Sequence, residues 1–199
     1  IREKSVSDKS SFFSAKISSL DELGEAGFIS DKFTYDIDGV KSQQFKDFIG
    51  LSELDENNKA MNSLLFSNDN LNASMEVGFK GNPNIGSVVL NKFKYTSFFT
   101  KFASNFEEND RVYIISSIFG GTGAAGFPLI LKNIRDAKDP VPHHAYLNSA
   151  KIGAVTVLPY FGVDKTSGAS IDSNTFISKS IAALKYYADN ICENKSINA

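Results

Sequence analysis

Residues 111–137 read RVYIISSIF, then GGTGAAG, then FPLILKNIRDA, and this succession decides the expected fold. Residues 111–119 form a short apolar, β-branched run, which is typical of a strand buried on both faces of a parallel sheet. The four glycines within 120–126 predict a loop. The apolar residues of 127–137 predict a helix that tolerates Pro128 near its start. The stretch therefore predicts a strand–loop–helix unit of an α/β protein.

A glycine loop in this position suits the binding of phosphate. Glycine has no Cβ, so backbone N–H groups can approach a ligand closely, and the following helix adds free N–H groups and the positive end of its dipole. Thr122 adds a hydroxyl to the loop. A tight turn that binds no ligand is the alternative interpretation.

The same order of elements recurs further along the chain. Residues 151–158, KIGAVTVL, predict a second buried strand, and residues 174–189 predict a helix. The apolar residues expected on one face of that helix are Ile177, Ile181, Leu184 and Tyr187. Strand, loop and helix in alternation predict an α/β fold with a Rossmann-like, doubly wound, mostly parallel sheet and helices on both faces.

The segments before residue 111 show less regular hydrophobic patterns. Residues 33–40 alternate like a short strand, and residues 41–75 suggest one or two surface helices or loops. Residues 78–86, GFKGNPNIG, hold three glycines and a proline, which predicts a turn rather than a helix. The apolar residues between 87 and 106 fit a helix.

The composition limits the classes of protein that we consider. A chain of 199 residues that is 42% hydrophobic suits one domain, which we expect to span residues 1–199 and to be incomplete at both ends. The net charge of −2 argues against binding to nucleic acid. The single cysteine, Cys192, excludes an internal disulfide and favours a cytoplasmic setting. No apolar run reaches the length of a membrane span.

Two nucleotide-binding signatures can be compared with the glycine run. Gly121, Gly123 and Gly126 satisfy G-x-G-x-x-G, so a Rossmann-type NAD(P)-dependent oxidoreductase is one alternative. That fingerprint expects an acidic residue at the end of the next strand, where this chain has Leu158 and Pro159. The P-loop signature, which ends in Gly-Lys-Ser/Thr, is absent from the sequence.

The glycine segments resemble those of the tubulin/FtsZ superfamily. Residues 120–125 are similar to its loop GGGTGSG or GGGTGTGAAP, with Phe119 in place of the first glycine. Residues 81–86, GNPNIG, are similar to the FtsZ stretch GANPEIG, and Lys80 stands where a glycine is usual.

Two downstream segments extend this resemblance. Residues 154–160, AVTVLPY, look like the family strand AVVTKPF, and residues 180–184, SIAAL, look like the helix segment GIEAL. The four matches follow the family order and cover roughly residues 76–190. The family's first glycine loop and the loop that carries its catalytic acid have no counterpart in this sequence.

The resemblance implies a protein that binds GTP or GDP with Mg²⁺ and assembles head to tail into filaments. It places the phosphates against two glycine segments and the ribose near an acid. The residues it implicates are Gly120, Gly121, Thr122, Gly123, Ala124 and Ala125 at the first phosphates, Gly81, Asn82 and Lys80 at the γ-phosphate, and Asp172 or Asp164 at the ribose. Lys165 or Lys179 would replace a family arginine.

Catalysis in this family depends on a neighbouring subunit, which supplies the acid that positions water. We therefore expect GTPase activity only from the full-length, assembled protein, and we assign no catalytic residue here. A nucleotide-free scaffold module with the same fold is a further alternative.

Overall fold

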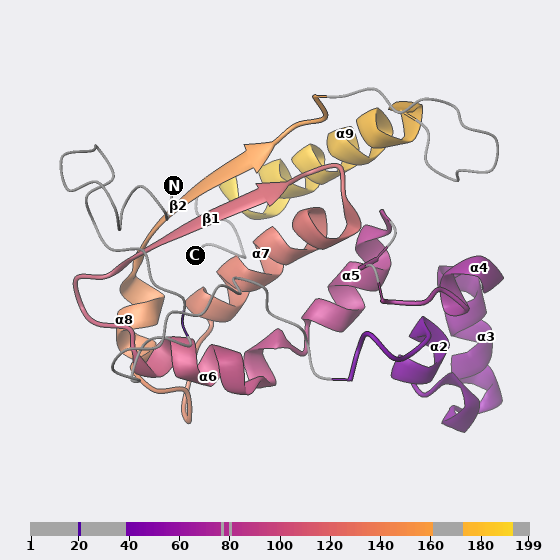
Figure 1. Ribbon diagram of the computed structural model, residues 1–199, viewed down its shortest axis with the longest axis horizontal. Coiled ribbons are helices and arrows are strands. Elements are labelled where there is room, and N and C mark those ends of the chain that lie inside the picture. The colour runs from indigo at the N-terminus through magenta and orange to yellow at the C-terminus, as the bar shows by residue number, and fades with distance from the viewer. Residues whose placement is uncertain (1–19, 21–38, 77, 80, 161–172, 193–199) are drawn as a thin grey trace, which may run out of the picture. The chain divides into compact units, whose positions relative to one another are not determined.

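A computed structural model describes residue 20 and residues 39–76, 78–79, 81–160 and 173–192 (Figure 1). The chain divides into two compact units, Ile1–Tyr35 and Asp36–Ala199. All the helices and strands named below belong to the second unit.

A parallel pair of strands forms the centre of this unit. Strand β1 (Arg111–Ser117) pairs with β2 (Lys151–Val157), with Arg111 opposite Lys151 and Ser117 opposite Val157. Helices α7 (Gly121–Arg135) and α8 (His144–Ser149) connect the two strands. The chain is therefore α/β, with a two-stranded parallel sheet in the part that the structure describes.

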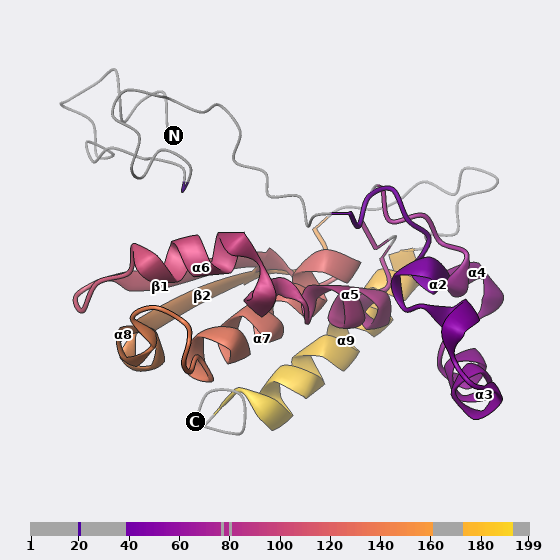
Figure 2. The same cartoon turned by 90° about the horizontal axis from the view of Figure 1, so that it is seen from below.

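Two helices cover one face of this sheet. Figure 2 shows α7 and α9 (Ser173–Asn190) on the same side of the strands. Their shared core is apolar and contains Ile114, Ile118, Phe127, Leu131, Tyr187 and Ile191. Burial of these side chains, each worth about 1.5–3 kcal/mol, fixes the helices on the sheet.

The opposite face of the sheet corrects the expectation of strands buried on both sides. The side chains of Tyr113 and Ile115 are 63% and 72% exposed, and those of Val155 and Val157 are also exposed. An apolar run shows that a strand can be buried on both faces, but it does not show that a covering layer is present. The ring of Tyr113 instead lies over Gly153, where a Cβ would come within 2.6 Å of it.

A second core lies among the helical segments of residues 45–90. These are α2 (Phe45–Phe48), η2 (Leu51–Glu53), α3 (Glu56–Leu65), α4 (Asn68–Leu71) and α5 (Pro83–Leu90). Phe45, Phe66 and Met75 pack there with Phe79, Ile85 and Val89. Because Phe79 and α5 also lie against α7, this core carries the residues around 78–86 to the start of α7.

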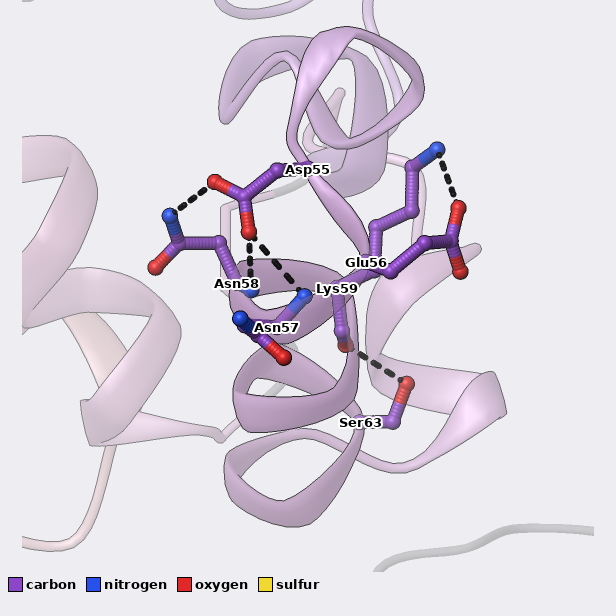
Figure 3. Close-up of polar contacts among 6 residues, drawn as sticks. All are labelled: Asp55, Glu56, Asn57, Asn58, Lys59 and Ser63. Carbon is purple, nitrogen blue, oxygen red and sulfur yellow. Dashed lines mark hydrogen bonds and ion pairs between the residues drawn. The ribbon is translucent and has the colours of Figure 1, made fainter.

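Helix α3 begins at a side-chain cap (Figure 3). The carboxylate of Asp55 accepts hydrogen bonds from the backbone N–H groups of Asn57 and Asn58, at 3.0 and 3.1 Å. The bonds from Asn58, first from its backbone and then from its side chain, hold the pKa of Asp55 below 3.8. This cap confirms a helix in the polar stretch 41–75.

The expected helix between 87 and 106 is broken into shorter pieces. Helix α5 already begins at Pro83, so the prediction of a turn through 86 was wrong for its last four residues. After α5 the chain forms η3 (Phe93–Tyr95) and α6 (Ser97–Ser104). Thr96 starts α6 anew, because its hydroxyl oxygen accepts from the N–H of Phe99.

Helix α9 has the predicted position but a different buried face. Ile177, Ile181 and Leu184 are exposed, and only Tyr187 of the predicted set is buried. The buried residues of the helix are Phe176, Ser180 and Tyr187, and Ile191 just after its end is buried as well. The helix carries two apolar stripes, and periodicity alone does not say which one meets the core.

Two other expectations concern the ends of the described ranges. Residues 33–38 of the predicted strand lie outside the described residues, and residues 39–40 form a turn. Among the helices that the structure describes, none is both long enough and apolar enough to span a bilayer.

Candidate functional site

The glycine run forms the first turns of α7, which corrects the prediction of a loop over 120–126. The helix begins at Gly121, and Gly120 is its N-cap residue with extended φ and ψ of −96° and 164°. Glycine permits a loop without requiring one, and here the chain turns before Gly121. No side chain caps this helix end. No side chain therefore occupies the N–H groups of its first turn, which lie at the positive end of the helix dipole, and within this turn Thr122 is exposed whereas Gly121 is buried.

The two glycine segments meet at this helix end. A Cβ on Gly121 would lie 2.8 Å from the backbone nitrogen of Asn82, and one on Gly86 would lie 2.6 Å from the carbonyl oxygen of Gly121. A Cβ on Gly78 would lie 3.5 Å from the hydroxyl of Thr122. Residues 78–79 and 81–82, called the turn at 78–82 below, therefore pack directly on the first turn of α7.

The turn at 78–82 has the backbone geometry of a tight reversal. Gly78 and Gly81 adopt left-handed φ values of 80° and 72°, which glycine tolerates best. Asn82 then caps α5, with its side-chain oxygen accepting from the N–H groups of Asn84 and Ile85 at 3.0 and 3.3 Å. The N-termini of α5 and α7 consequently lie next to each other.

Lys179 brings a cation to the same turn. From α9, its Nζ donates to the carbonyl oxygen of Gly81 at 2.5 Å. Of the two lysines named as replacements for the family arginine, Lys179 thus lies at the site. Lys165 lies outside the described residues.

Packing explains some of the glycines without any ligand. A Cβ on Gly123 would collide with the carbonyl oxygen of Ser117, and one on Gly121 would collide with residues of the 78–82 turn. Packing does not require glycine at position 120, since a Cβ there would lie 3.4 Å from the Ser117 hydroxyl. It does not require glycine at position 126 either, where the atom nearest to a Cβ, a methyl of Leu90, would lie at 3.5 Å.

Only some of the remaining predicted site residues lie near the N-terminus of α7. The N–H of Ala124 donates to the carbonyl oxygen of Gly120, so it is already used within the helix. Ala124 and Ala125 border a cavity on the flank of α7 rather than its tip. Lys80 and both candidate ribose acids, Asp164 and Asp172, lie outside the described residues.

A side chain that the sequence did not single out fastens α9 to this helix. The hydroxyl of Tyr187 donates to the carbonyl oxygen of Ala124 at 2.9 Å. Because Pro128 has no N–H, that carbonyl lacks its ordinary helical donor four residues later. Burial, with a smaller effect of Tyr186, raises the pKa of Tyr187 to about 12. The sequence signal was Pro128 itself, which predicts an unpaired carbonyl but not its partner.

Protein side chains alone form no metal site in the ranges that the structure covers, since no three His, Cys, Asp or Glu residues gather there. No protein-family model, no characterised protein and no solved structure matches the chain. The geometry of the two glycine segments is therefore the basis for assigning a function.

Proposed function

We propose that this chain is the nucleotide-binding part of a tubulin/FtsZ-like protein that binds GTP or GDP with Mg²⁺ and assembles head to tail into filaments. One observation carries the proposal. The uncapped first turn of α7 lies against the glycine turn at 78–82, just beyond the carboxyl end of β1. That end of a parallel sheet is where α/β proteins bind nucleotides.

The donors at this point suit a chain of phosphates. The N–H groups of Gly121, Thr122 and Gly123 and the Thr122 hydroxyl would hold the α- and β-phosphates. The turn at 78–82 and the Lys179 ammonium would lie toward the γ-phosphate. Mg²⁺ would bridge phosphate oxygens, which requires few protein ligands.

The uncovered sheet face supports a larger, doubly wound sheet in the complete protein. Tyr113, Ile115 and Val155 form an exposed apolar surface on the side away from α7 and α9. In doubly wound folds such a surface is covered by a second layer of helices. We propose that further chain supplies this layer and additional strands.

Hydrolysis of GTP would depend on a second subunit. General-base chemistry needs a carboxylate or similar group within hydrogen-bond reach of the attacking water. The tubulin/FtsZ resemblance assigns this acid to the neighbouring subunit in the filament. We therefore expect the isolated chain to bind nucleotide without turning it over.

The packing of the glycines favours one other candidate, a nucleotide-free scaffold module. Gly121 and Gly123 are required by their neighbours whether or not a phosphate binds. An NAD(P)-dependent oxidoreductase is less well supported. The third glycine of its fingerprint allows close packing of helix on strand. Here Gly126 meets only a Leu90 methyl, at an ordinary contact distance.

Calorimetric titration of the full-length protein with GTP, NAD and NADP tests the proposal. We expect GTP to bind and the dinucleotides to give no heat. Gly120→Val should weaken GTP binding at least about tenfold, equivalent to about 1.4 kcal/mol, because under this proposal a branched side chain at the N-cap position of α7 would hinder the close approach of phosphate to its first turn.

Gly126→Ala is the matched control, because it removes another glycine of the same run where a Cβ has room. It should leave GTP binding unchanged. Failure of wild-type protein to bind GTP, or equal affinity of Gly120→Val and wild type, contradicts the nucleotide proposal. Nucleotide-dependent sedimentation of the wild type tests the filament separately.

A further inference from the structure

A cavity of about 860 Å³ lies beside α7, between α5 and α9. It follows the flank of α7 from Ala124 to Lys132 and reaches Asn82 and Lys179 of the proposed nucleotide site at one end. Its volume falls within the range of about 300–1,000 Å³ that is usual for small-molecule sites. The proposed phosphate contacts at the first turn of α7 do not use the flank near Lys132.

The walls of the cavity combine apolar and polar residues. Small side chains of α7 and α9 form much of the apolar part, namely Ala124, Ala125, Pro128, Ala182 and Ala183. Asn84 and Ser87 of α5 and Asn190 of α9 contribute amides and a hydroxyl. A ligand there would bury an apolar body while its polar groups meet hydrogen-bond partners.

The charged residues of the lining are all cations. Lys179 and Lys132 both border the cavity, and no acidic residue is found among its described lining residues. Lys179 donates to Gly81 beside the N-terminus of α5, whereas Lys132 lies in the last turn of α7. Lys132 makes no ion pair or hydrogen bond with another side chain in the described ranges, so its ammonium is available to an anion.

We propose that this cavity binds an organic anion of metabolite size, with an extended apolar body and a carboxylate, sulfonate or phosphate group. The apolar body lies against the alanines and Pro128, and the anionic group pairs with Lys132, because Lys179 already donates to the carbonyl oxygen of Gly81.

Fluorescence titration with 8-anilinonaphthalene-1-sulfonate tests the site, because this probe combines an aromatic body with a sulfonate and becomes bright away from water. The uncharged analogue N-phenyl-1-naphthylamine measures the apolar contribution alone. We expect the sulfonate to bind with a saturable, single-site component that the neutral analogue lacks. Excess GTP should not displace it, which keeps this result independent of the proposed function.

Filling the cavity should remove this component. Ala182 is exposed at the cavity wall, so Ala182→Phe blocks the space without entering the core. Ser87→Phe blocks it from α5 and serves if the first variant fails to fold. Ile181→Phe is the matched control, because residue 181 is exposed on the same helix but does not line the cavity.

Removing the charge separates this site from general apolar binding. Lys132→Gln should weaken the sulfonate about three- to fivefold and leave the neutral analogue unchanged. Lys185→Gln, on an exposed position of α9 outside the lining, should change neither. The proposal is overturned if the filled variants bind the sulfonate like wild type, if both lysine variants behave alike, or if GTP displaces the probe.

Discussion

The hydroxyl of Tyr187 replaces a hydrogen bond that Pro128 removes from α7, and its deletion gives a prediction with a calculable size. Tyr187 is only 7% exposed, and its hydroxyl lies 2.9 Å from the carbonyl oxygen of Ala124. Tyr187→Phe keeps the ring, which packs edge-on against Phe127 at 5.1 Å between centroids, and deletes only the donor. A buried acceptor left without its donor costs about 1–3 kcal/mol, which is the expected loss in unfolding free energy.

Urea unfolding followed by far-ultraviolet circular dichroism measures this loss, since the chain has no tryptophan to report it. Tyr186→Phe is the control, because its side chain is 47% exposed on the same helix. That control should change the unfolding free energy by less than about 0.5 kcal/mol.

A double-mutant cycle with Pro128→Ala tests the cause directly. Alanine restores an N–H at position 128, so the carbonyl of Ala124 regains a helical donor. In that background Tyr187→Phe should cost less, with a coupling energy of about 1 kcal/mol or more. Equal costs of Tyr187→Phe in both backgrounds would refute the reasoning, as would a cost no larger than that of Tyr186→Phe.

Three further outcomes follow from single residues. The pKa of Tyr187 rises from 10.0 to about 12 on folding, so the neutral phenol is favoured in the folded state. Its contribution to stability is therefore complete below pH 10 and is lost between pH 10 and 12. The loss is at most about 1.4 kcal/mol per pH unit, less what water screens, and it is absent in urea titrations of Tyr187→Phe. Gly123→Ala should lower the unfolding free energy by about 2 kcal/mol or more, because the new Cβ meets the backbone of Ser117, whereas Gly126→Ala should change it by less than about 1 kcal/mol in the same assay. Asp55→Ala should speed hydrogen exchange in the first turn of α3. Because the hydrogen bonds from Asn58 lower the pKa of Asp55 from its ordinary value of 3.8, the protection of these N–H groups, corrected for the intrinsic pH dependence of exchange, should fall in wild-type protein as the pH drops below 3.8, and constant protection in acid would contradict the cap.

The elements best predicted from the sequence are those with one consistent local pattern. Strand β1 was expected at 111–119 and ends at Ser117, and β2 was expected at 151–158 and ends at Val157. Helix α9 was expected at 174–189 and spans Ser173–Asn190. In each case a continuous apolar or amphipathic run is bounded by polar residues, glycine or proline, so local preference and tertiary packing agree.

The helix boundaries before β1 were harder to predict from the sequence, because capping residues rather than hydrophobic periodicity set them. The apolar residues between 87 and 106 continue through a break that Thr96 creates by capping α6. Asn82 followed by Pro83 is a recognisable helix start, yet the surrounding glycines outweighed it in the prediction. A single capping bond decides such a boundary, and a count of apolar residues does not detect it.

The contacts of the candidate site could be expected only in outline. The resemblance placed both glycine segments around the same phosphates without specifying a contact between them, and the structure brings the backbone of Asn82 against Gly121. The bond from Lys179 to Gly81 spans 98 residues, and no local pattern encodes its partner. Long-range partners depend on how α9 packs on α7. The sequence pattern predicted the wrong face of α9 for this contact.

Two physical requirements can each select glycine in the run 120–126, namely a lack of room for a Cβ and the close approach of a ligand. The sequence alone does not distinguish them. At Gly121 and Gly123 the neighbouring atoms leave no room for a Cβ, so the fold demands glycine with or without a phosphate. At Gly120 the backbone is extended and a Cβ would lie 3.4 Å from the Ser117 hydroxyl, so the fold itself accepts a side chain there. Under the proposed function, close approach of a phosphate would be the reason for a glycine at this position. Binding measurements on Gly120 variants therefore report on the ligand, whereas variants of Gly121 or Gly123 report on the fold.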